Sequence, residues 1–209
     1  DDEAMASLAA LLVDEYAKRY LPEDTARFAY LLSRLKKSMT SLLCYLRDEQ
    51  NQSQFKPVAC ELKIGRGEDA VPGQVYRLSD GRTVQLVGTV DRADEWIEDD
   101  GTRWVRVVDY KTGAKRFDLA ELRYGLGLQM LLYLFTLRDE GGKLFGGYPI
   151  EPAGVLYLPA REKLLNLPRN ASEAEIERAM HKELQRSGMV LNDPAVLHAM
   201  EHSALEAPC

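Results

Sequence analysis

Cysteine is scarce in this chain, and its three cysteines stand far apart. Because Cys44, Cys60 and Cys209 contain no CxxC pair and are odd in number, they provide neither a disulfide framework nor a cysteine-based zinc site. Proteins without disulfides are typical of reducing compartments, so we expect a cytoplasmic protein.

Several other features are absent. The sequence has no apolar run of about eighteen residues, which excludes a membrane-spanning helix. It has no GxxxxGK[ST] motif and no GxGxxG after a strand, which excludes an ATPase or dinucleotide site. The acidic N-terminus is unlike a secretory signal. Because residue 1 is not Met and the sequence stops abruptly at Cys209, we expect a fragment of a longer protein.

Positive charge is in slight deficit. The 209 residues include 27 Lys and Arg against 33 Asp and Glu, a net charge of −6, and 45% are hydrophobic. This composition is typical of a globular domain. It argues against a protein that coats nucleic acid through bulk charge, but it allows a local basic groove.

The spacing of apolar residues changes along the chain. Three-to-four spacing predicts helices, whereas a period of two from residue 56 predicts hairpin-connected strands, with a further strand over 154–158. The expected helices cover 4–20, 25–50, 118–138, 172–186 and the stretch from Pro194. We therefore expect an α/β domain made of a helical N-terminal part (1–54), a core (55–160) and a helical C-terminal part (161–209).

The second expected helix has a basic face. Between positions 26 and 47 it carries five basic residues and no acidic one: Arg27, Arg34, Lys36, Lys37 and Arg47. Two interpretations remain open. The face is either a solvated side of a helix packed on the core, or one wall of a groove that binds phosphate groups.

One hairpin has a register that its own side chains predict. If Asp99, Asp100 and Gly101 form the turn, Trp96 faces Trp104, which is a favourable aromatic pair. In the same register Asp94 faces Arg106, a favourable pair of opposite charges.

That register places Asp91 opposite Asp109, with Lys111 on the same face. Directly opposed residues have their Cβ atoms about 5 Å apart, so two carboxylates there repel each other unless a cation compensates them. Carboxylate oxygens suit Mg²⁺ or Mn²⁺, and a neighbouring lysine can orient water or stabilise charge on a phosphate. The pattern indicates metal-assisted phosphodiester hydrolysis. The alternative is a set of strand-end ion pairs with Arg92 and Lys111.

Three motifs on these elements resemble those of RecB-like nucleases in the PD-(D/E)XK superfamily. Residues 108–113 (VDYKTG) match the family's DYKTG run, 88–94 (GTVDRAD) match G-x-x-D-R-x-D, and 129–133 (QMLLY) match Q-x-x-x-Y. Residues 154–161 and 188–194 look like the C-terminal nuclease domain of AddB-type subunits of bacterial helicase–nuclease complexes. The resemblance implies a restriction-endonuclease-like fold, a mixed sheet flanked by helices.

The resemblance also implies roles at the hairpin. Asp91 and Asp109 would bind the metal, with the backbone carbonyl of Tyr110 as a third ligand. Lys111 would be the catalytic residue that positions or activates the attacking water.

Five further positions are assigned by the same resemblance. Gln129 and Tyr133 are four residues apart and share one helix face, which in the family borders the catalytic site and contacts DNA. Glu61 stands where related exonucleases have an additional acidic residue near the metal, although an exposed strand glutamate fits equally. Lys115 and Arg116 either touch phosphate or belong to a solvated loop.

The chain departs from the family in two respects. RecB-like nucleases carry a metal-ligand histidine on a helix before these strands, whereas His181, His198 and His202 all lie near the C-terminus. AddB-type subunits also hold an iron–sulfur cluster with four cysteines, which this chain does not provide. We therefore expect Mg²⁺ or Mn²⁺ as the cofactor and no iron–sulfur cluster in this fragment.

The expected function is metal-dependent exonuclease action on DNA, as the nuclease domain of an AddB-like subunit in double-strand-break repair by recombination. By resemblance, its partners are single-stranded DNA at duplex ends and an ATP-dependent, AddA-like helicase subunit. Two alternatives remain: a nuclease-like DNA-end-binding or scaffold module without turnover, and a stand-alone RecB-like exonuclease.

Overall fold

The computed structural model describes most of the chain. The described residues are 1–20, 25–113, 117–125, 127–160, 168, 171–172, 174–175, 178–179, 182 and 185–202.

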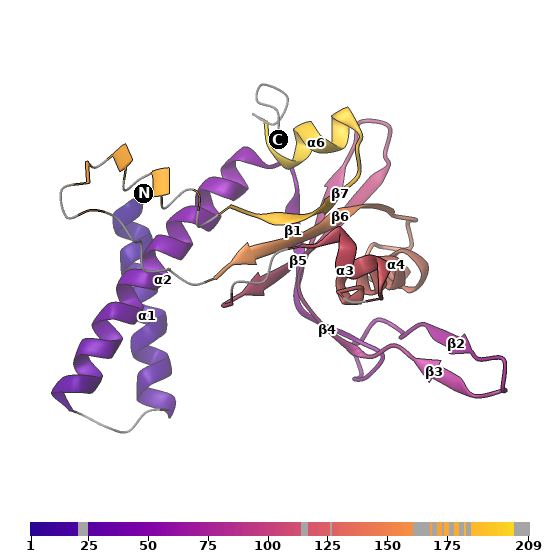
Figure 1. Cartoon of the computed structure of the whole chain (residues 1–209), viewed down its shortest axis with the longest axis horizontal. Helices are drawn as coiled ribbons and strands as arrows, with labels where there is room; N and C mark the ends of the chain where they lie inside the picture. The colour runs from indigo at the N-terminus through magenta and orange to yellow at the C-terminus, as the bar shows by residue number, and fades with distance from the viewer. Residues whose placement is uncertain are drawn as a thin grey trace.

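A mixed five-stranded sheet forms the centre of the molecule (Figure 1). The strand order is β1-β4-β5-β6-β7, in which β5 and β6 are parallel and the other neighbours are antiparallel. The bounds are β1 (Lys56–Ile64), β4 (Gly88–Ile97), β5 (Arg103–Lys111), β6 (Glu151–Pro159) and β7 (Ser187–Val190). Helices pack on both faces of this sheet, so the expected α/β architecture is confirmed.

The β4–β5 hairpin has the predicted register. Gly101 adopts a φ of 90°, which glycine reaches without steric cost, and its N–H donates to the carbonyl of Glu98 at 2.9 Å. Trp96 therefore pairs with Trp104, as the sequence predicted. The expected pairing of Asp94 with Arg106 is also confirmed.

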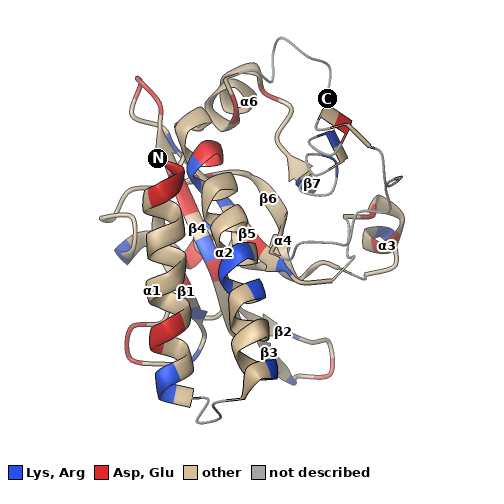
Figure 2. Cartoon of the chain, turned by 90° about the vertical axis from the view of Figure 1, so that its left-hand side faces the viewer, with Lys and Arg blue, Asp and Glu red and all other residues tan. Residues whose placement is uncertain are grey.

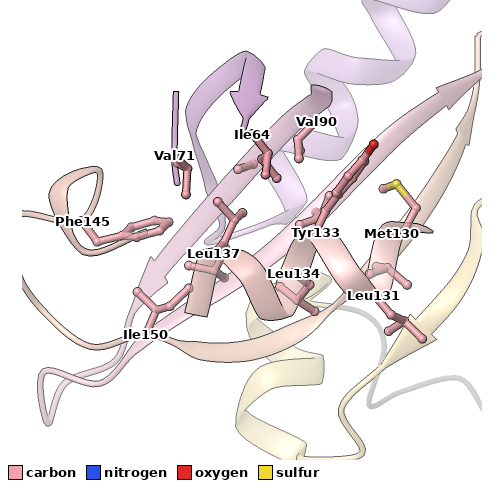
Figure 3. Close-up of a cluster of buried hydrophobic side chains, with 14 of the residues drawn as sticks. Ile64, Val71, Val90, Met130, Leu131, Tyr133, Leu134, Leu137, Phe145 and Ile150 are labelled. Carbon is pink, nitrogen blue, oxygen red and sulfur yellow. The ribbon is translucent and has the colours of Figure 1, made fainter. Parts of the chain in front are cut away.

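Helix α4 (Gln129–Glu140) covers one face of the sheet. It buries Tyr133, Leu134 and Leu137 against strand residues that include Val90 (Figure 3).

The prediction of a single helix over 118–138 is wrong, because this stretch contains two helices. A short α3 (Leu119–Arg123) ends before Gly125 and Gly127, whose positive φ values of 77° and 71° stop the helix, and α4 follows as a separate element. A 3-10 turn, η1 (Gly141–Lys143), follows α4.

Helices from the N-terminal and C-terminal parts of the chain cover the other face of the sheet. Helices α1 (Asp2–Tyr20) and α2 (Ala26–Gln52) form an antiparallel hairpin, and α6 (Pro194–Met200) lies near the end of α2 (Figure 1). Tyr45 and Leu46 of α2 pack on Val108 and Leu158 at the sheet. The rest of α2, towards its N-terminus, extends past the ends of β5 and β6 (Figure 1).

Strands β2 (Val75–Arg77) and β3 (Thr83–Gln85) form a separate two-stranded ribbon beside the main sheet (Figure 1).

Two predictions about the organisation of the chain are not tested. Most of the helix expected over 172–186 falls outside the described residues, and the division of the chain at residues 54 and 160 stays a prediction. None of the helices that the structure describes is long and apolar enough to cross a membrane.

Candidate functional site

Strands β4 and β5 separate at one end of the sheet. Their pairing ends at Arg92 and Val108. Beyond that point β4 stays paired with β1 as far as Gly88, while β5 stays paired with β6 as far as Lys111. We refer to this point of separation as the fork. Asp91 is the first residue of β4 beyond the last pair, and Asp109 is the first of β5.

The Asp91 side chain bridges the fork. Its Oδ2 accepts a hydrogen bond from the backbone N–H of Tyr110 at 2.8 Å. This bond links β4 to β5 where the backbone ladder has stopped. Asp91 is thereby held against the residue that lies between Asp109 and Lys111.

Asp109 and Lys111 lie side by side on β5, as the predicted shared face requires. The Lys111 ammonium forms an ion pair with Asp109 Oδ2, a buried oxygen that has no other polar partner within the described part of the chain. The two side chains are only 17% and 28% exposed, for Asp109 and Lys111 respectively. Lys111 Nζ also lies 5.3 Å from the ring centroid of Tyr157, which limits where the ammonium can go.

Glu61 lies on the neighbouring strand at the level of Asp91. Its flanking residues, Cys60 and Leu62, pair with Arg92 and Val90. Glu61 is exposed and has a φ of 51°, a left-handed conformation that is uncommon for a non-glycine residue. Such a conformation costs about 1 kcal/mol or more and is often kept at functional sites.

The carboxylates at the fork do not form a ready-made cage. Among the described residues, no three His, Cys, Asp or Glu side chains are grouped so that they alone could hold a metal ion. Asp91 and Asp109 still provide hard oxygen donors, and the buried Asp109 Oδ2 already lies against a cation. The donor set fits Mg²⁺ or Mn²⁺, because Mg²⁺ usually binds through one or two carboxylates and keeps several waters.

Gln129 and Tyr133 form a connected pair on α4. Gln129 Nε2 donates to the Tyr133 hydroxyl at 2.8 Å. Gln129 is exposed, whereas Tyr133 is 3% exposed and its ring belongs to the core. Gly88 faces this hydroxyl so closely that a Cβ at position 88 would collide with it. The glycine of one motif and the tyrosine of another are therefore in direct contact.

The strand ends are supported from the opposite face by buried charges. Arg92 donates to the Tyr110 hydroxyl at 2.9 Å and forms an ion pair with Asp94 at 2.8 Å. Burial raises the pKa of the Tyr110 hydroxyl, against the opposing effect of Arg92. Residues 91 and 92 thus hold Tyr110 at two points, the backbone N–H and the hydroxyl.

Glu49 of α2 is the central acceptor of this network. Its side chain is 2% exposed and pairs with Arg106 at 2.7 Å and with Arg92 and Arg186 at 3.3 Å each. Burial would raise the pKa of Glu49, but the three guanidiniums outweigh burial and hold it below its ordinary value.

Sequence reasoning missed Glu49 and Arg186, because neither belongs to a motif and both come from outside the strands. The pair of Asp94 and Arg106 was the one signal of this buried network in the sequence. It placed two charges on a face of the sheet that the structure shows to be buried. Lys115 and Arg116, which were expected to lie near phosphate, fall outside the described residues.

Known proteins resemble this chain over most of its length. The family model of the PD-(D/E)XK nuclease superfamily matches residues 1–206. The chain is 34% identical over 207 residues to a subunit of the ATP-dependent helicase/deoxyribonuclease of Symbiobacterium thermophilum, covering 98% of this chain and 18% of that protein. It is 33% identical to the corresponding subunits from Anoxybacillus flavithermus and Bacillus cereus, covering 95% and 93% of this chain and 17% of each relative. The chain therefore spans less than a fifth of the length of these relatives.

Proposed function

Because the chain belongs to the PD-(D/E)XK nuclease superfamily, we propose that it hydrolyses DNA phosphodiester bonds with a divalent metal, as an exonuclease. The observation that carries this proposal is the arrangement at the fork. Asp91 is bonded to Tyr110, and Tyr110 lies between Asp109 and Lys111, which form an ion pair. A nuclease needs acidic metal ligands and a cation close to the scissile phosphate, and these residue types fit both needs.

Asp91 and Asp109 would hold the metal, together with the backbone carbonyl of Tyr110 and, as a candidate, Glu61. A bound Mg²⁺ or Mn²⁺ would neutralise phosphate charge and make water more acidic. Lys111 would orient the attacking water and stabilise negative charge on the phosphate. Gln129 would contact DNA, because it is the exposed member of its pair, and Tyr133 would hold Gln129 in place.

The relatives support a wider role. They are described as subunits of ATP-dependent helicase/deoxyribonucleases. We propose that the protein containing this chain works in the cytoplasm with an AddA-like helicase subunit and receives single-stranded DNA from duplex ends. Its role would be the processing of double-strand breaks for recombination.

The test is cleavage of end-labelled single-stranded and duplex DNA with Mg²⁺ or Mn²⁺. We expect Asp109→Asn and Lys111→Ala each to reduce the cleavage rate by about 100-fold or more, a loss of the size seen when one charge-stabilising group is removed. Asp99→Asn is the matched control, since Asp99 is an exposed aspartate in the turn of the same hairpin.

Cleavage that survives both substitutions would contradict the assigned site. A parent chain that binds DNA but never cleaves it, with either metal, would favour the end-binding module. Ladder-like release of mononucleotides from one end would support exonuclease action, and internal cuts in circular DNA would contradict it.

A further inference from the structure

The basic residues of α2 fall into two groups that the sequence alone does not separate. Lys36 pairs with Asp14 at 2.7 Å and Arg47 with Asp2 at 2.6 Å, so both are neutralised by acidic residues of α1. With 3.6 residues per turn, Lys36 and Arg47 lie within about 20° of each other around the helix, so both face α1.

The second group lies on a different side of α2. Arg27, Arg34 and Lys37 are exposed, and within the described part of the chain none of them has an ion-pair partner. They fall within about 80° of one another around the helix; Arg27 and Arg34 are roughly opposite Lys36, and Lys37 is about 100° from it. Tyr30 lies in the same stripe and is 61% exposed. We refer to Arg27, Tyr30, Arg34 and Lys37 as the basic ridge.

The basic ridge extends away from the fork. Further along the same helix, Tyr45 packs on the cluster of Val108, Leu156 and Leu158, on the face of the sheet opposite Asp109 and Lys111. Lys37 is two turns before Tyr45, and Arg27 lies about 15 Å beyond Lys37 along the axis. In Figure 2 the Lys and Arg positions of α2 are blue. Most of them lie on the part of the helix that extends away from the sheet.

We propose that the basic ridge binds the phosphates of a single DNA strand that leads to the fork. The inference rests on the proposed nuclease function, which it extends by giving the substrate a path. Exposed cations that have no ion-pair partner among the described residues complement a polyanion. An exposed tyrosine between arginines provides a stacking surface for an unpaired base, which is how proteins bind single strands without sequence preference.

The test is fluorescence anisotropy of a labelled thirty-nucleotide oligo-dT with EDTA present, so that no cleavage occurs. Relative to the parent chain, the variant Arg27→Ala/Arg34→Ala/Lys37→Ala should bind about tenfold or more weakly at 50 mM salt. Its slope of log K against log salt should be smaller by about 2, because each lost phosphate contact removes roughly 0.7.

The matched control is Lys36→Ala/Arg47→Ala, which changes two cations of the same helix that face α1. It should keep the parent's slope. Tyr30→Ala should weaken single-strand binding by about fivefold or more, the lower end of a base-stacking contribution, and leave duplex binding nearly unchanged. Equal affinities and slopes for parent and triple variant, or equal losses in the control, would overturn the proposal. So would a parent chain that does not bind the oligonucleotide.

Cleavage assays separate this proposal from the proposed function. The triple variant should raise the KM for single-stranded DNA and keep kcat, whereas Asp109→Asn should keep oligonucleotide binding and lose kcat. If the parent binds through the ridge but never cleaves, the nuclease proposal fails while the ridge stands. If the parent cleaves and the triple variant has an unchanged KM, the ridge proposal fails alone.

Discussion

Asp91 and Arg92 are adjacent in β4 and both hold Tyr110 of β5, one at its backbone and one at its hydroxyl. The two contacts lie at the point where the strand ladder stops, so side chains replace the backbone hydrogen bonds that normally join neighbouring strands. This arrangement explains why an aspartate and an arginine follow each other at the fork. In the proposed site Asp91 would be a metal ligand, and Arg92 holds Tyr110 from the opposite face of the sheet.

Gly88 allows a prediction at the scale of single residues. We expect Gly88→Ala to lower the unfolding free energy by about 1–3 kcal/mol, since the new methyl group would overpack against the Tyr133 hydroxyl. Tyr133→Phe removes that hydroxyl, so the double variant should regain part of the loss. Urea unfolding of the parent, both single variants and the double variant measures this coupling. Additive losses in the double variant would mean that the contact is not the cause.

At the scale of elements, the buried network joins α2 to β4 and β5 through Glu49, Arg92 and Arg106. Because the pKa of Glu49 is lower in the folded protein than in the unfolded chain, the ionised carboxylate stabilises the fold. This contribution is complete above the ordinary glutamate pKa of about 4.3 and is lost as the pH falls through the lower folded-state value.

We therefore expect Glu49→Gln to destabilise the protein by about 3–5 kcal/mol at neutral pH, because it leaves two buried guanidiniums without their shared partner. The difference between parent and variant should shrink as the pH falls below about 4.3. Urea unfolding between pH 3 and pH 7 measures it. Asp80→Asn is the control, since Asp80 and Arg82 form an exposed pair that should contribute little. A difference independent of pH would contradict the assigned role of Glu49.

Sequence reasoning succeeded for elements whose geometry is set locally. A three-residue turn and two side-chain pairs were enough to fix the β4–β5 register, because a slip of one residue would reverse every side chain. It failed between residues 118 and 138, where two glycines stop a helix that the apolar pattern alone would continue. It could not anticipate Glu49 beneath the strands, because that contact joins residues 43 positions or more apart and depends on how α2 packs.

For the whole molecule, the proposed metal should act as a stabilising ligand. A ligand at 100 times its Kd adds about 2.7 kcal/mol, which for a chain of this size raises the Tm by on the order of 5–10 °C. We expect Mn²⁺ to raise the Tm of the parent and of Asp99→Asn, and to leave Asp109→Asn unchanged. Thermal unfolding with Mn²⁺ and with EDTA measures this shift. A similar rise in Asp109→Asn would place metal binding elsewhere in the chain.

The left-handed backbone at Glu61 has a consequence unrelated to catalysis. β1 is an edge strand of the main sheet, and an edge strand offers free N–H and C=O groups to any other extended chain. A residue with positive φ in the middle of β1 interrupts the regular spacing of those groups, and the exposed charges of Lys56, Glu61 and Lys63 discourage the burial of this edge against another strand. The left-handed residue at Glu61 therefore makes β1 a poorer template for pairing with another molecule.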